Sequence, residues 1–137
     1  MNLEKLVTSF DLSKRLKSAG VEQSANYWWS DEGNLMYEMA GRLPNINYKA
    51  YHYSAFLAEE LLAMLPGEIK TSDGSNRTYI LVIDRDGFDV MWQVQYIFDN
   101  CGTWEILRKE ERDYYKNSEH LAEAAGELLL KIWEGGK

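Results

Sequence analysis

"ANYWWSDEGNLMYEMA", residues 25–40, places two aromatic-rich runs on either side of the turn-forming letters DEGN. This pattern predicts a β-hairpin with Glu32 and Gly33 at its tip, because glycine readily adopts a positive φ. A helix over LMYEMAGRL, residues 35–43, remains the alternative, since Leu, Met, Glu and Ala favour helices. The hairpin reading decides how the rest of the fold is arranged.

Two neighbouring tryptophans stand on the first strand of this hairpin. The predicted tip pairs Trp28 with Tyr37 and Trp29 with Met36. Successive side chains of a strand point to opposite faces of a sheet, so the two indoles cannot line one ligand platform. We expect one indole in the core and the other on the opposite face, covered by a second layer of structure or by a partner.

A second and clearer hairpin is predicted over residues 77–98, where RTYILVID and FDVMWQVQYIF flank Arg85-Asp86-Gly87. An Asp-Gly tip gives one apolar face. Its pairs are Ile83 with Val90, Leu81 with Trp92, and Tyr79 with Val94. The reverse face is mixed and pairs Val82 with Met91, Ile80 with Gln93, and Thr78 with Gln95.

Helical periodicity and end signals predict the helices. Thr8-Ser9-Phe10-Asp11 resembles a capping box, and the helix that it opens ends at Gly20. Ser54 is the predicted cap of a second helix, SAFLAEELLAMLP. Ser118 is the predicted cap of the last one, SEHLAEAAGELLLKIWEGG, which Gly135 terminates.

Together these elements predict an α+β fold in a single domain of residues 1–137. Its antiparallel sheet is made chiefly of the two hairpins, with two to three flanking helices. Residues 99–117 fit both an edge strand and a short helix. Apolar side chains on both faces of the first hairpin favour an α/β/α sandwich or a homodimer that hides one face.

Composition narrows the classes of partner and the compartment. The chain has 22 acidic and 15 basic residues and a net charge of −7, which opposes binding to nucleic acid or to an anionic membrane. No apolar run approaches the roughly 18–20 residues of a membrane helix, and no apolar signal stretch opens the sequence. A lone cysteine, Cys101, agrees with a reducing compartment. We expect a cytoplasmic protein.

Candidate catalytic and metal-ligating residues are few. Asp84, Asp86 and Asp89 gather at the second hairpin tip, but their spacing lacks the distal glutamate of a calcium loop. Solvated surface carboxylates and a cation site therefore both stay open, the first being favoured.

The two histidines, His52 and His120, lie far from Cys101 in sequence, and no nucleophile elbow, phosphate loop or dinucleotide fingerprint is present. The sequence thus predicts no enzyme and no catalytic, cofactor-binding or metal residues.

An acidic stripe marks the last predicted helix, where Glu119, Glu123 and Glu127 recur every four residues. Such a stripe is typical of the wet side of an amphipathic helix, and it also suits a mimic of DNA phosphates. Three interaction surfaces are therefore predicted: one of Trp28 and Trp29, the reverse face with Met91 and Gln93, and this acidic stripe.

An opening segment and two later helical segments resemble a known group of proteins. LSKRLKSAGVEQSANYWW is similar to the opening of small uncharacterised phage and prophage proteins, and YSAFLAEELLAMLP and SEHLAEAAGELLLKIWE are similar to their later helices. In that group a proline-containing entry precedes the Leu-rich helix, where this chain has His52-Tyr53-Ser54.

The resemblance implies a mobile-element origin and carries over no catalytic residues. The leading hypothesis is a noncatalytic protein-interaction or regulatory module. The alternatives are an acidic inhibitor of the DNA-mimic, anti-restriction or immunity type and, less favoured, a small hydrolase or metal-dependent enzyme.

Overall fold

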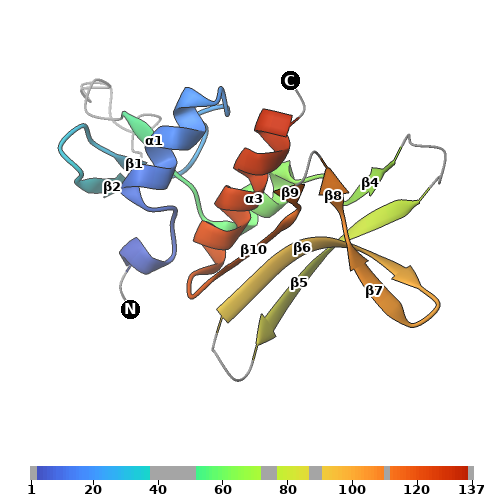
Figure 1. Cartoon of the computed structure of the whole chain (residues 1–137). Coiled ribbons are helices and arrows are strands. Elements are labelled where there is room, and N and C mark those ends of the chain that lie inside the picture. Colours follow the sequence, from blue (N-terminus) through green and yellow to red (C-terminus); the bar gives the residue numbers. More distant parts are fainter. Residues whose placement is uncertain (1–2, 38–51, 72–76, 87–90, 110–111, 136–137) are drawn as a thin grey trace.

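The computed structural model describes residues 3–37, 52–71, 77–86, 91–109 and 112–135. It confirms the α+β class, with three α-helices and two main antiparallel sheets of three and five strands (Figure 1). In chain order the elements are η1 (Leu3–Lys5), α1 (Phe10–Ser18), β1 (Tyr27–Trp29), β2 (Leu35–Tyr37), β3 (Tyr53–Ala55), α2 (Ala58–Met64), β4 (Glu68–Lys70), β5 (Thr78–Asp86), β6 (Met91–Asn100), β7 (Thr103–Ile106), β8 (Arg108–Lys109), β9 (Arg112–Asp113), β10 (Tyr115–Ser118) and α3 (Leu121–Gly135).

The two hairpins belong to different sheets. β1 and β2 form a small sheet with β3, in the order β2-β1-β3, while β5 and β6 belong to a large sheet ordered β10-β6-β5-β4 with β7 also beside β6. β3 pairs with the edge of β1 that faces away from β2. The second hairpin therefore cannot extend the first hairpin's sheet at this edge. The helices lie between the two sheets, so the layer order is sheet, helices, sheet rather than α/β/α (Figure 1).

The first hairpin forms, but its predicted register is wrong by one residue. Its loop has three residues instead of two: the Ser30 amide donates to the Asn34 carbonyl oxygen at 2.9 Å, and Gly33 has a φ of 87°. A three-residue loop with a left-handed glycine adds one residue to the turn and shifts the ladder. The observed pairs are Trp28 with Met36 and Trp29 with Leu35.

The second hairpin has the predicted faces in a different register. Ile83 pairs with Val94, and Leu81 with Tyr96, a shift of four residues toward a longer connection. An even shift leaves every side chain on its original face, so the apolar pattern alone cannot distinguish the two registers. The inner side chains of Tyr79, Val94 and Tyr96 are buried against the helices. The predicted tip at Gly87 lies outside the described residues.

Two predicted helix caps are strand residues instead. Ser54 is buried in β3, and α2 begins after Leu57, whose amide donates to the Glu60 side chain at 2.8 Å. Ser118 ends β10, and its hydroxyl accepts the amide of His120 at 3.1 Å, just before α3. Both serines pair with neighbouring strands, which outweighs their local preference for helix ends. The ambiguous segment 99–117 contributes strands to the large sheet and the short β8–β9 ladder.

Gly20 ends α1 as predicted. Its φ is 96°, its amide donates to the Lys17 carbonyl at 3.0 Å, and the amide of buried Val21 donates to Leu16 at 3.1 Å. These two bonds form a Schellman motif.

Replacement of Gly20 by alanine is therefore expected to lower the free energy of unfolding by about 1–2 kcal/mol, because a Cβ disfavours the left-handed backbone. Urea denaturation measures this change. Gly67→Ala is the matched control, since no atom lies within 4 Å of the added Cβ and its φ is not left-handed. Equal losses at both glycines would contradict the interpretation.

Tyr96 is fully buried on the inner face of the large sheet, and its hydroxyl donates to the Pro66 carbonyl at 2.6 Å. Burial raises the pKa of Tyr96. In the unfolded chain a tyrosine loses its proton near pH 10, whereas folded Tyr96 keeps it, so stability is retained below about pH 10 and falls above it.

The expected loss is up to about 1.4 kcal/mol for each further pH unit. Urea unfolding at about pH 8, 10 and 11 measures it. Tyr96→Phe, which has no ionisable hydroxyl at this position, should show a flatter dependence than the wild type. Parallel curves for the two proteins would count against this role of Tyr96.

Candidate functional site

The large sheet has one covered and one open face. Its inner face packs on α2 and α3, and its outer face points away from them (Figure 1). Among the described residues, no helix or strand covers the outer face. Directly paired residues share a face, so the ladders define it. Its members are Glu68, Lys70, Thr78, Ile80, Val82, Asp84, Met91, Gln93, Gln95, Ile97, Asp99, Trp104, Ile106, Tyr115 and Asn117.

An apolar cluster occupies one end of the outer face. Ile80, Ile97 and Ile106 lie side by side on β5, β6 and β7, and Trp104 follows on the same face of β7. Ile97, at the centre, is only 3% exposed, while Ile80, Trp104 and Ile106 around it are 51%, 61% and 39% exposed. Large apolar side chains gathered on one open face are typical of a surface that binds a partner.

The predicted reverse-face residues belong to this same outer face. Gln93 lies between Asp84 and Asn117, and Met91 lies opposite Asp86 at the sheet's other end. Both predicted side chains are partly buried. Gln95 separates them from Ile97 on the same face of β6, so neither belongs to the apolar cluster.

The longer connection places Gln93, and not a second carboxylate, opposite Asp84. The Asp84 carboxylate accepts the amide of Arg85 at 2.8 Å. Asp89 lies outside the described residues, and within the described part of the chain no three His, Cys, Asp or Glu side chains gather as a metal site would require.

The two tryptophans diverge as an extended strand requires. Trp29 is 6% exposed, and its indole nitrogen donates to the Thr8 carbonyl at 2.9 Å. Trp28 points to the other face, is partly buried, and donates to the Ala25 carbonyl at 2.8 Å. Trp29 is thus a core residue. The Trp28 indole is held by a hydrogen bond to the segment that directly precedes β1.

The acidic stripe of α3 is largely used within the molecule. Glu123 accepts hydrogen bonds from the amide and hydroxyl of Ser9, which caps α1 through the Leu12 amide at 3.2 Å. In a local capping box this carboxylate would come from the helix's own third residue, whereas here α3 supplies it.

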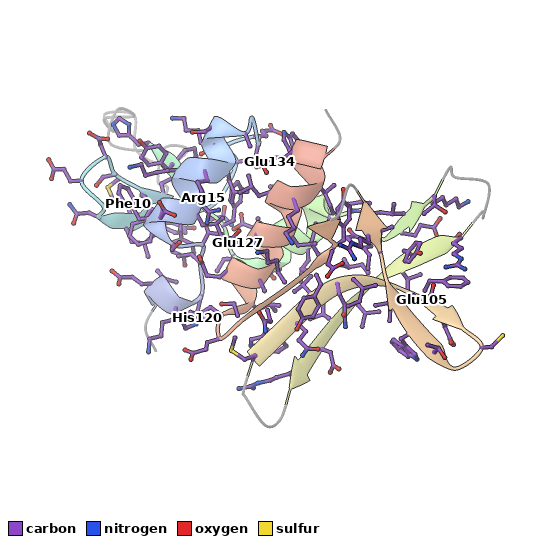
Figure 2. All side chains as sticks on the ribbon, viewed as in Figure 1. Phe10, Arg15, Glu105, His120, Glu127 and Glu134 are labelled. Atoms are coloured by element: carbon purple, nitrogen blue, oxygen red, sulfur yellow. The ribbon has the colours of Figure 1, made fainter. Side chains whose placement is uncertain are left out.

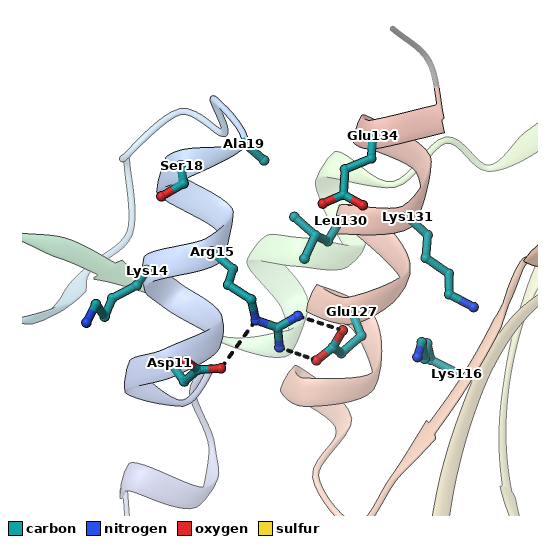
Figure 3. A pocket seen from close by; sticks show the side chains of 10 residues that line it. All are labelled: Asp11, Lys14, Arg15, Ser18, Ala19, Lys116, Glu127, Leu130, Lys131 and Glu134. Atoms are coloured by element: carbon teal, nitrogen blue, oxygen red, sulfur yellow. Dashed lines mark hydrogen bonds and ion pairs between the residues drawn. The ribbon is translucent and has the colours of Figure 1, made fainter.

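Glu127 binds Arg15 through two hydrogen bonds of 2.5 and 3.3 Å (Figure 3). Arg15 also contacts Asp11 at 3.3 Å, and these carboxylates raise the pKa of Arg15. Glu119 remains exposed. Two of the three predicted glutamates therefore hold α1 against α3.

A groove of about 710 Å³ lies between α1 and α3 and reaches β10 (Figure 3). It combines cations and anions: Lys14, Arg15, Lys116 and Lys131 stand beside Asp11, Glu127 and Glu134. Within it, Lys131 donates to the Asp113 carbonyl at 2.9 Å. Because opposite charges are interleaved along the groove, it has no strong preference for one sign of ligand.

The candidate catalytic side chains come from separate elements. Cys101 is exposed in the turn between β6 and β7, His52 precedes β3, and His120 precedes α3. Figure 2 shows Glu105, on the same β6–β7 hairpin as Cys101, well away from His120. His120 lines a smaller, mostly apolar hollow of about 330 Å³ with Leu6 and Trp92. The structure does not bring a histidine together with Cys101.

Sequence reasoning missed the most exposed part of the outer face. Trp104 and Ile106 fell in the segment that fitted strand and helix equally, although their spacing of two places them on one face of a strand. Comparison of the chain with protein-family models, curated proteins and solved structures found no match. Within the described residues, no helix combines the length and apolarity needed to cross a membrane.

Proposed function

We propose that this chain is a noncatalytic protein-interaction or regulatory module of phage or prophage origin, working in the cytoplasm, and that it binds protein through the outer face of its large sheet. One observation carries the proposal: Ile80, Trp104 and Ile106 expose 39–61% of their surfaces together on an uncovered sheet face. Burial of such side chains against a partner contributes about 25 cal/mol per Å². The resemblance to small phage proteins supports the origin.

The charge pattern supports protein rather than nucleic acid as the partner. The chain carries a net charge of −7. Two of the basic side chains on α1 are already engaged, Arg15 with Glu127 and Lys17 with the His52 carbonyl at 2.7 Å. A phosphate-binding surface needs clustered, available cations.

Site-specific photo-crosslinking tests the proposal. A benzophenone amino acid is placed at Ile106 on the outer face or, as a control, at Trp133 on α3, which has nearly the same exposure (39% and 38%). In the organism that encodes the chain, position 106 should form protein adducts that position 133 does not. Absence of adducts at 106, or the same adducts at both positions, would contradict the proposal.

A further inference from the structure

We propose, building on the function proposed above, that the occupant of the outer face is a second copy of this chain, in a two-fold symmetric dimer that packs the two sheets face to face. A two-fold interface places the same surface on both subunits, so that surface must complement itself. The outer face can be tested for this property residue by residue.

The apolar end of the outer face meets the requirement. Ile80, Ile97 and Ile106 form a continuous row across three strands, with Trp104 beside it. Apolar side chains complement one another without any directional partner, and two such rows can interdigitate as the inner faces of a β-sandwich do, about 10 Å apart.

The polar end is also self-complementary. Gln93 and Gln95 follow on β6, and Asn117 lies opposite Gln93 on β10. An amide side chain both donates and accepts hydrogen bonds, so like residues can pair across a two-fold axis. Carboxylates alone could not do so, because they would repel their own copies.

Charged groups of the outer face lie at its margins and have local partners. Glu68 and Lys70 lie 4.0 Å apart on the edge strand β4. Asp84 accepts the Arg85 amide, and Asp99 accepts the Gly102 amide at 3.0 Å in the β6–β7 turn. A chain of net charge −7 therefore presents a face with little net charge at its centre. This pattern fits a second copy better than a strongly basic partner, which would be matched by clustered acids.

The outer face is large enough for a small dimer interface. β6 has ten residues and is flanked by β5 and β4 on one side and by β7 and β10 on the other. At about 3.3 Å per residue and about 4.8 Å between strands, the 30 residues of these five strands cover a plane of roughly 480 Å² before side-chain relief is added. A standard interface buries about 800 Å² on each partner.

Sedimentation velocity over a range of protein concentrations tests the dimer. The wild type should pass from 15.9 kDa to twice that mass. Because the two copies carry the same net charge, added salt should strengthen their association, the opposite of what a basic partner would show.

Ile80→Asp and Ile83→Asp form a matched pair of variants. Both isoleucines lie on β5 with exposures of 51% and 41%, but only Ile80 is on the outer face. Ile80→Asp should raise the dimer Kd by about 100-fold or more, since it buries a carboxylate among the apolar side chains of the interface, and Ile83→Asp should leave it unchanged.

Circular dichroism checks that both variants fold. If Ile80→Asp does not, Trp104→Ser replaces it, with the exposed Trp133→Ser as its control. A wild type that stays monomeric, or equal effects of the two members of a pair, would overturn the dimer. A monomer whose position 106 still crosslinks to a different protein would overturn the dimer and leave the proposed function standing.

Discussion

Replacement of Trp29 by alanine is expected to lower the free energy of unfolding by about 3–5 kcal/mol, the usual cost of removing a large buried aromatic side chain. Trp29 is only 6% exposed and meets the ring of Phe10 edge-on, with centroids 5.8 Å apart. Its indole also donates to the Thr8 carbonyl, which would lose this partner. The small sheet and α1 should therefore loosen together.

Trp28→Ala is the matched control, because the same side chain is removed one residue away. Trp28 is partly buried, and the cavity left by its removal opens toward solvent, so its replacement should cost less than half as much. Urea denaturation followed by far-UV circular dichroism measures both variants. If the two replacements cost the same, Trp29 does not anchor the core as described.

Replacement of Gly126 by valine is expected to cost about 2–3 kcal/mol, because it overpacks the contact between α3 and α1. A Cβ at Gly126 would lie 2.8 Å from Leu12 Cδ2 and 3.2 Å from Thr8 Cγ2. Both neighbours are fully buried, so neither can move aside without disturbing its own surroundings. Thermal or urea unfolding measures the loss.

A double-mutant cycle with Leu12→Ala gives the control for this close contact. The smaller residue at position 12 leaves room for the valine methyl groups, so Gly126→Val should cost at least about 1 kcal/mol less in that background than in the wild type. The same cost in both backgrounds would show that steric overlap with Leu12 is not the cause.

Local signals in the sequence predicted elements that depend on their own residues. Gly20 ends its helix because the left-handed backbone is a property of that position. The divergence of Trp28 and Trp29 follows from the geometry of any strand. The inner face of the second hairpin was identified for the same reason, since alternation along one strand already fixes which side chains share a face.

Features that depend on pairing between distant segments could not be predicted. The third strand, β3, uses Ser54, whose local preference is for a helix cap, and only the free edge of β1 explains its extended conformation. The register of β5 and β6 was ambiguous because an even shift preserves the faces. In the candidate site, the sequence placed Met91 and Gln93 on the correct face of the sheet. Trp104 and Ile106 could not be assigned to that face, because the sequence did not decide whether their segment is a strand.

The hydrogen bonds between Glu123 and Ser9 make the cap of α1 depend on a distant part of the chain. The first helix receives part of its N-terminal cap from a residue 114 positions later in the chain. During synthesis the amino-terminal half must leave the ribosome with the Ser9 amide still bound to water. The cap of α1 is complete only when α3 docks against it, so each of these two helices depends on the other.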